Sequence, residues 1–244
     1  MRTLQLVTLA LLGCHVSAWA AERPEDPVAT SLKAKLAATY PATEFRDLRA
    51  TAMAGIYEVS MGRNVAYVGS DARYFLFGHL YDMQAQKDLT AERLEQARRI
   101  DFTSLPLTDA IQTVHGDGSR RLAVFSDPDC PYCKQLEQTL AKLDNVTIHT
   151  FLYPLDELHP EARAKAIAVW CAQDRATAWK ALMTDGTPPR SADCAHPIDR
   201  NIALARKLGV DGTPVLFDSQ GRRLVGAAPV ERIEAFLTAG EERP

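Results

Sequence analysis

The sequence predicts two consecutive units of different fold class: a small α+β unit with an antiparallel sheet, then a larger α/β unit with a mixed sheet. Short alternating apolar runs separated by turns fill residues 44–81, a charged helix is expected at residues 89–100, and from residue 107 buried strands alternate with helices. The 244 residues, 46% hydrophobic and 24% charged, are enough for two globular units of this kind.

The first 20 residues are typical of an export signal. Arg2 supplies a positive start, the apolar run after it is too short to span a bilayer, and residues 18–20 (AWA) match a cleavage site. We therefore expect residues 1–20 to be removed on export. An alternative is lipoprotein anchoring at Cys14, because residues 11–14 (LLGC) look like a lipoprotein signal. The formal net charge of −3 does not favour a nucleic-acid partner.

The first unit should begin with a helix over residues 28–39, where leucine and alanine recur at helical spacing before Pro41. Alternation and turn spacing then predict an antiparallel meander with strands at residues 44–50, 56–61, 65–68 and 74–81. Such a small sheet can bury little apolar surface alone, so we expect it to pair with a second copy of the chain.

A charged helix over residues 89–100, with Thr90 as its predicted N-cap, joins the two units. We interpret this helix as a rigid linker, because the composition changes on both sides of it. An ordinary surface helix within one continuous domain is the alternative. The predicted boundaries are residues 21–86 for the first unit, 87–105 for the linker and 106–244 for the second unit.

The second unit should open with a β-hairpin around the turn at residues 116–118 (GDG). A crossover helix after a buried strand requires a mixed sheet with helices on its faces. The predicted strands are residues 110–114, 120–125, 146–153, 215–217 and 222–225. A largely helical segment should cover residues 160 to about 183 and then 198–208, and a closing helix residues 230–239.

Cys130 and Cys133 lie where the second of these strands ends and an amphipathic helix begins. At a helix start, unpaired N–H groups and the positive end of the helix dipole favour a thiolate. We therefore expect Cys130 to be exposed, with a lowered pKa, and Cys133 to lie one turn inside as the resolving thiol. Pro131 suits an early helical position, because its missing N–H would have had no partner there.

Other uses of a C-x-x-C motif fit this sequence less well. A zinc site would need a second pair of ligands at similar spacing, which the sequence lacks, and haem attachment would need histidine where Lys134 stands. A purely structural disulfide is disfavoured by the two-residue spacing at a helix start. We therefore interpret the motif as a redox dithiol that needs no metal and no cofactor.

Cys171 and Cys194 are the cysteines that remain if Cys14 leaves with the signal. An even number of cysteines in an exported protein favours disulfide bonds. A bond between these two would close a loop of about 24 residues and contribute about 3 kcal/mol in the chain-entropy model. We interpret the bond as structural, with two buried free thiols as the alternative.

Pro214 opens a strand that should be central, where proline normally removes a sheet hydrogen bond. A cis Thr213–Pro214 bond would resolve this, and would expose the backbone of Thr213 beside the dithiol to an extended substrate chain. Asp127 has two interpretations, assistance in proton transfer or a role in the turn. We interpret the histidines at 79, 115, 149, 159 and 196 as surface or packing residues.

Together these motifs resemble the DsbC/DsbG family of periplasmic disulfide isomerases. The resemblance covers nearly the whole chain after the signal. It implies a thioredoxin-like α/β domain with a helical insert, a cystatin-like N-terminal dimerisation domain, and a V-shaped homodimer in the periplasm. The motifs that carry it are residues 125–127 (FSD), 130–133 (CPYC), 170–172 (WCA) and 212–214 (GTP).

The resemblance also implies residue roles and partners. Cys130 would attack a wrong disulfide and form a mixed disulfide, and Cys133 would resolve it. Misfolded disulfide-bonded exported proteins would be the substrates, and a membrane reductase of the DsbD type would keep the dithiol reduced. The residues implied to contact substrate are Pro131, Tyr132, Thr213 and Pro214, and the implied structural disulfide is Cys171–Cys194.

Two other functions stay open at this point. A DsbG-like protein would act as a holdase chaperone or would reduce sulfenic acids with the same dithiol. A DsbA-like oxidase is disfavoured by the additional N-terminal unit and by tyrosine at position 132. Because Tyr132 carries no positive charge, Cys130 should be less acidic than the corresponding cysteine of a C-P-H-C motif.

Overall fold

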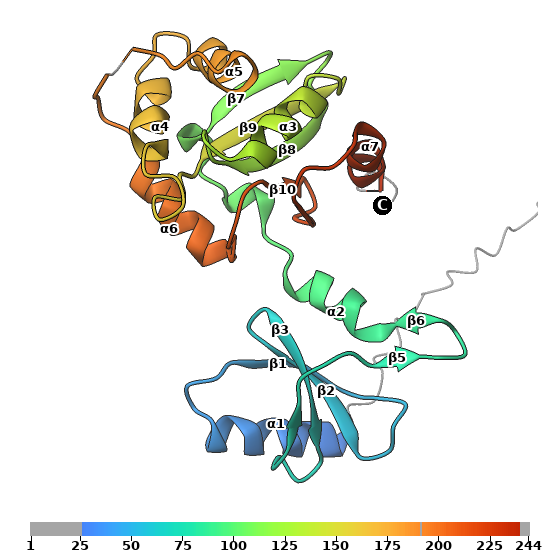
Figure 1. Cartoon of the computed structure of the whole chain (residues 1–244). Helices are drawn as coiled ribbons and strands as arrows, with labels where there is room; N and C mark the ends of the chain where they lie inside the picture. Colours follow the sequence, from blue (N-terminus) through green and yellow to red (C-terminus); the bar gives the residue numbers. More distant parts are fainter. Residues whose placement is uncertain (1–25, 191, 240–244) are drawn as a thin grey trace, which may run out of the picture.

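The computed structural model describes residues 26–190 and 192–239. The predicted export signal at residues 1–20 and the alternative lipid site at Cys14 lie outside the described residues. Within the described part, no helix has the length and apolar character needed to cross a bilayer. The chain forms two units, each built on its own sheet, with a short helix between them (Figure 1).

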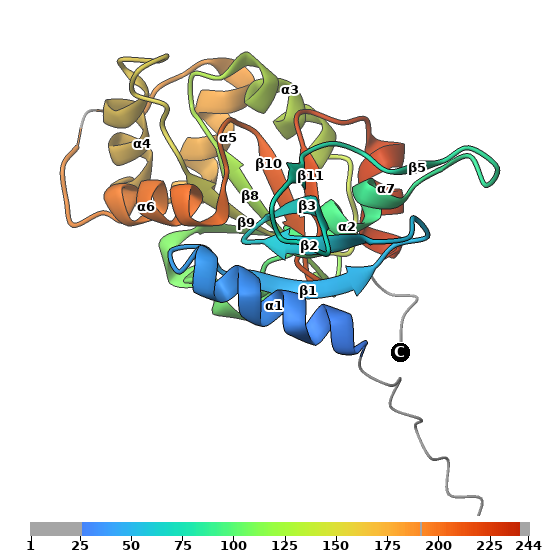
Figure 2. The same cartoon turned by 90° about the horizontal axis from the view of Figure 1, so that it is seen from below.

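The N-terminal unit is a four-stranded antiparallel sheet with one helix against it, as predicted (Figures 1 and 2). The helix begins at Asp26, whose carboxylate accepts a hydrogen bond from the N–H of Val28 at 2.9 Å. Leu32 and Leu36 then pack against the sheet. In sheet order the strands are β1 (Phe45–Ala50), β2 (Ile56–Met61), β3 (Asn64–Gly69) and β4 (Phe75–Leu76), and the helix is α1 (Pro27–Thr39).

The predicted strand at residues 74–81 is wrong in its length. Only Phe75 and Leu76 pair with β3, and the chain then leaves the sheet. The cause is a competing partner, because the N–H of Leu80 donates to Oγ1 of Thr90 at 2.7 Å. The following residues form a separate two-stranded hairpin, β5 (Tyr81–Asp82) with β6 (Lys87–Asp88).

The helix between the units, α2 (Leu89–Ala97), starts one residue before the predicted N-cap. Asp88 caps it by accepting from the N–H of Ala91 at 2.9 Å. Thr90 is buried and bonds the hydroxyl of Tyr67 in β3, so it anchors the helix to the sheet. The prediction of Thr90 as N-cap is therefore wrong.

Two hydrogen bonds to main-chain carbonyls join the first unit and the segment after α2 to the second unit. The N–H of Ile100 donates to the carbonyl of Gly221 at 3.0 Å. Gly221 has a positive φ of 73°, and a side chain there would collide with the backbone of Ile100. The guanidinium of Arg63, from the turn after β2, donates to the carbonyl of Lys207 at 3.2 Å.

The second unit is a five-stranded sheet in the order β11-β10-β8-β9-β7. Only β8 and β9 are parallel, which confirms the predicted mixed sheet. Helices α3 and α7 share one core with the sheet, and α4, α5 and α6 contribute to the other. The strands are β7 (Ile111–His115), β8 (Arg120–Ser126), β9 (Val146–Leu152), β10 (Val215–Asp218) and β11 (Arg223–Val225). The helices are α3 (Pro131–Leu140), α4 (Ala162–Trp170), α5 (Arg175–Asp185), α6 (Ile198–Leu208) and α7 (Val230–Thr238), preceded by two 3-10 turns at Phe102–Ser104 and Leu107–Asp109.

The predicted hairpin between β7 and β8 is wrong, because β9 lies between them. His115 of β7 and Arg120 of β8 both stand opposite Val146, the first residue of β9. Strand β8 is buried for most of its length, so it needs a paired neighbour on each edge, and β9 offers it seven parallel positions. The glycine-containing turn therefore passes over the start of β9 instead of closing a hairpin.

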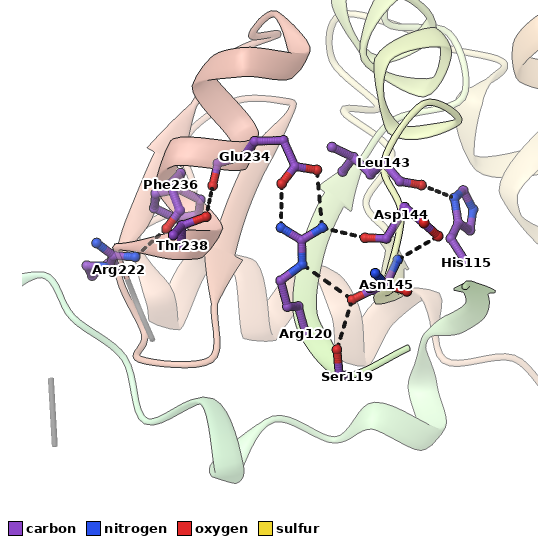
Figure 3. A network of polar contacts seen from close by, with 10 residues as sticks. All are labelled: His115, Ser119, Arg120, Leu143, Asp144, Asn145, Arg222, Glu234, Phe236 and Thr238. Carbon is purple, nitrogen blue, oxygen red and sulfur yellow. Dashed lines mark hydrogen bonds and ion pairs between the residues drawn. The ribbon is translucent and has the colours of Figure 1, made fainter. Parts of the chain in front are cut away.

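A polar network fixes this crossing (Figure 3). Arg120 pairs with Glu234 of α7, with one N···O distance of 3.1 Å, and donates to the carbonyl of Asn145 at 3.3 Å. Gly116 has a φ of 55°, and a side chain at this position would collide with Asp144 and Asn145. The start of β8 is thus tied both to the start of β9 and to α7.

Candidate redox site

The dithiol lies at the N-terminus of α3, directly after the buried end of β8. Cys130 is the N-cap of the helix with extended backbone angles, φ −72° and ψ 122°, and Pro131 is in the first turn. Cys133 faces the core and is fully buried. Both cysteines are free thiols.

Cys130 is only 5% exposed, so the prediction of an exposed sulfur is wrong. The cause lies in the loop before β10, in which the Thr213–Pro214 peptide bond is cis. The carbonyl oxygen of Thr213 lies 3.5 Å from the Cys130 sulfur, and Pro214 is buried. Tyr132, by contrast, is 63% exposed beside the dithiol.

The two thiols have opposite acidities. The pKa of Cys130 is lowered to about 5, first by a hydrogen bond from the Cys133 thiol and also by the N–H groups of Cys133 and Tyr132. Burial raises the pKa of Cys133, and its bond to Cys130 raises it further. At neutral pH the arrangement therefore holds one thiolate at the helix start and one protonated thiol behind it.

Asp127 contacts both cysteines and is completely buried. Its main-chain N–H points at the Cys133 sulfur at 3.5 Å, and its Oδ1 accepts from the N–H of Cys130 at 3.1 Å. Oδ1 also accepts from the N–H of Asp129 at 2.7 Å. Of the two interpretations of Asp127, the geometry favours the role in the turn.

The second oxygen of Asp127 reaches the loop between β9 and α4. It accepts from the N–H of Leu155 at 2.6 Å and from Nδ1 of His159 at 3.0 Å. His159 was expected to be a surface or packing residue. Since 32 residues separate it from Asp127 and it belongs to no motif, the sequence holds no signal for this contact.

Cys171 and Cys194 form a disulfide with a Cα–Cα distance of 5.8 Å. The bond joins the end of α4 to the segment before α6 and encloses α5. Nearby, Trp170 is buried, with the guanidinium of Arg175 over its ring at 3.8 Å. Among residues 26–190 and 192–239 there is no group of three His, Cys, Asp or Glu side chains placed to hold a metal ion.

A free dithiol at a helix start, against a cis-proline loop and on a mixed sheet, defines a thioredoxin-like thiol–disulfide oxidoreductase. Comparison with known proteins agrees. Residues 107–241 match the family described as thioredoxin-like domain. Residues 18–91 match the family described as disulfide bond isomerase protein N-terminal domain.

Relatives specify the family further. The probable thiol:disulfide interchange protein DsbC of Bordetella pertussis is 41% identical over 212 residues, which are 87% of this chain and 75% of that protein. DsbC of Escherichia coli K12 is 27% identical over 195 residues, 78% of this chain and 80% of the relative. The crystal structure of a disulfide interchange protein from Neisseria gonorrhoeae, 38% identical, aligns with a TM-score of 0.55 over 57% of this chain and all of that one. This chain belongs to the DsbC family of thiol:disulfide interchange proteins, as the motifs predicted.

Proposed function

We propose that this protein isomerises or reduces incorrect disulfides in exported proteins through a mixed disulfide at Cys130. The observation that carries the proposal is the pairing of a thiolate, with a pKa of about 5, and a buried thiol at Cys133. A thiolate attacks a disulfide, whereas a thiol does not. The protonated state of Cys133 gives the substrate time to rearrange before the resolving thiol acts.

The proposed reaction balances without a cofactor. The Cys130 thiolate bonds to one sulfur of a wrong disulfide, and the other substrate sulfur leaves as a thiolate. In isomerisation another substrate thiolate then attacks the substrate sulfur that is bonded to Cys130. A new substrate disulfide forms, and Cys130 leaves as the thiolate. In reduction, Cys133 loses its proton and attacks Cys130, so the substrate leaves as a dithiol and the protein becomes oxidised.

The reductive branch requires an electron donor. The Cys130–Cys133 disulfide must accept two electrons and one proton to restore the Cys130 thiolate and the Cys133 thiol before the next cycle. We propose a dithiol membrane reductase of the DsbD type in this role, and the periplasm as the compartment. The predicted signal at residues 1–20 and the family membership of the chain support this assignment.

The surface around the dithiol suits an extended polypeptide. We assign Tyr132 and Pro131, at the exposed start of α3, and Thr213 and Pro214, in the facing loop, as substrate contacts. The Thr213 carbonyl lies beside the Cys130 sulfur, so a chain bonded to that sulfur would run along this loop.

The N-terminal unit supplies the second part of the proposal, which is a homodimer. Large apolar side chains are exposed on β4 and the hairpin after it, with Tyr74 at 66%. Surfaces of this kind usually mark interaction sites. We propose residues 21–86 as the dimerisation domain, 87–105 as the linker and 106–244 as the catalytic domain. The exposed side chains are Tyr74, Leu76, Phe77, Tyr81 and Met83.

The same apolar surface supports a second candidate function, a DsbG-like holdase chaperone that binds unfolded chains without thiol chemistry. The two functions separate by substitution of Cys130. We expect the reduced wild-type protein to restore activity to a scrambled, multiply disulfide-bonded test protein, and Cys130→Ser to lose that ability while still suppressing aggregation. Recovery at the wild-type rate by Cys130→Ser would rule out the proposed exchange chemistry.

A further inference from the structure

One buried side chain, Asp127, makes the hydrogen bonds that hold the turn carrying Cys130. Asp127 is fully buried, and its two oxygens accept four hydrogen bonds at 2.6–3.1 Å. Two of the donors belong to the dithiol turn and two to the loop between β9 and α4. A buried carboxylate is costly unless it is hydrogen-bonded, and these four bonds offset that cost while tying the dithiol turn to the loop.

His159 is the side chain that bonds this carboxylate from the loop between β9 and α4. Its Nδ1 lies 3.0 Å from Oδ2, and the ring is partly exposed. The other carboxylate in the turn, Asp129, is paired with Lys165 of α4 at 2.7 Å, and Lys165 also contacts Glu161. Each acidic side chain next to Cys130 is therefore matched by a basic group from the same loop and helix.

Resting on the proposed role of Cys130 as nucleophile, we propose that Asp127 is a positioning residue and that His159 holds it in place. By fixing the N–H of Cys130, Asp127 keeps that residue in its N-cap conformation, so that the sulfur meets the N–H groups of Tyr132 and Cys133. Its own N–H meanwhile points at the Cys133 sulfur. One residue thus sets the geometry of both thiols.

The isosteric substitution Asp127→Asn tests this directly. An amide replaces one acceptor oxygen by NH2, which must then face N–H donors of the turn or of the loop. The Cys130 turn should loosen and the pKa of Cys130 should rise by about one unit, so that its thiolate fraction at pH 5 falls from about half to about a tenth. The readout is thiolate absorbance at 240 nm in the reduced full-length protein, with the oxidised protein as blank.

Asp156→Asn is the matched control, because Asp156 lies on the same loop but its carboxylate is exposed and pairs with Arg163 at 2.8 Å. That variant should titrate like the wild type. An unchanged or lowered pKa of Cys130 in Asp127→Asn would overturn the proposal, since removal of a negative charge alone would lower the pKa. A purely structural role would reduce the melting temperature without moving the titration.

Two variants of the partner decide the matter if Asp127→Asn does not fold. His159→Phe removes the donor and should raise the pKa of Cys130, as Asp127→Asn does. His159→Gln retains an N–H donor, so its Cys130 pKa should stay near the wild-type value. Equal titrations for these two variants would overturn the proposal. A wild-type protein in which Cys130 does not react would instead contradict the proposed function itself, so the two failures are distinguishable.

Discussion

The two cysteine pairs of this chain belong to the same domain, but their surroundings give them different chemistry. Cys130 and Cys133 stand at a helix start, where N–H groups stabilise a thiolate. Cys171 stands at the opposite end of its helix, α4, and its bond to Cys194 joins that helix to a distant segment. Position relative to a helix therefore separates an exchangeable pair from a structural one more clearly than the mere presence of two cysteines.

The two pairs are also connected. The disulfide closes the segment that contains α5, and Trp179 of α5 donates to Oε1 of Glu137 at 2.9 Å. Glu137 belongs to α3, the helix that carries the dithiol. The Cys171–Cys194 bond therefore holds in place an insert that packs on the redox helix. Substitutions in the dithiol, in this disulfide and at Glu137 should have different consequences.

The largest effect is expected from Cys133→Ala. This change removes the thiol that donates to Cys130, the first cause of its lowered pKa, so the pKa of Cys130 should rise by about two units. Mixed disulfides with substrate should also accumulate, because nothing resolves them. Absorbance at 240 nm measures the first result, and non-reducing electrophoresis measures the second.

Cys133→Ser is the matched control for that experiment, since its hydroxyl is still a donor. It should trap mixed disulfides as Cys133→Ala does, but with a smaller rise in the pKa of Cys130. If the alanine variant titrated like the wild type, the low pKa of Cys130 would have to come from Thr213 and the N–H groups of the helix start.

A second prediction concerns stability. Replacing Cys171 and Cys194 together by alanine should reduce the free energy of unfolding by about 3 kcal/mol in the chain-entropy model. Because the dithiol is not part of this bond, the pKa of Cys130 should stay near 5 in the folded variant. Urea unfolding followed by fluorescence measures the first quantity. Loss of thiol exchange in a fully folded double variant would contradict the division between the pairs.

The last effect depends on pH and is expected at Glu137, where burial raises the pKa of the carboxyl to about 7. The folded protein holds this proton at pH values where the unfolded chain, with a pKa near 4.5, has lost it. Stability should therefore fall as pH rises from about 4.5 to 7, by about 3 kcal/mol, and then level off. Glu137→Gln should abolish this slope and be more stable than the wild type at pH 8, as urea unfolding at several pH values would measure. A slope unchanged in the glutamine variant would assign the pH dependence to other groups.

Much of the site could be predicted from local sequence patterns. The dithiol at a strand–helix junction follows from residue spacing and helix physics, and a cis bond before Pro214 follows from proline at the start of a central strand. The structure contains both features, along with the bond between Cys171 and Cys194. Each of these inferences needs only neighbouring residues or a count of cysteines.

The features that the sequence did not predict all depend on contacts between distant segments. Strand β9 enters between β7 and β8 because β8 needs a second neighbour, which periodicity within one segment does not reveal. Cys130 is buried because the Thr213 loop folds over it from 83 residues away. The contact of His159 with Asp127 is of the same kind, since it joins the loop after β9 to the turn after β8.

The central claim is that Cys130 alone among the cysteines forms the bond to substrate. The most direct measurement is to incubate reduced Cys133→Ala protein with a scrambled disulfide-bonded protein, quench with acid and map the mixed disulfide by mass spectrometry after digestion. Substrate peptides linked to Cys130, with the Cys171–Cys194 bond intact, are the predicted result. Substrate linked to Cys171 or Cys194, or no covalent complex at all, would contradict the claim.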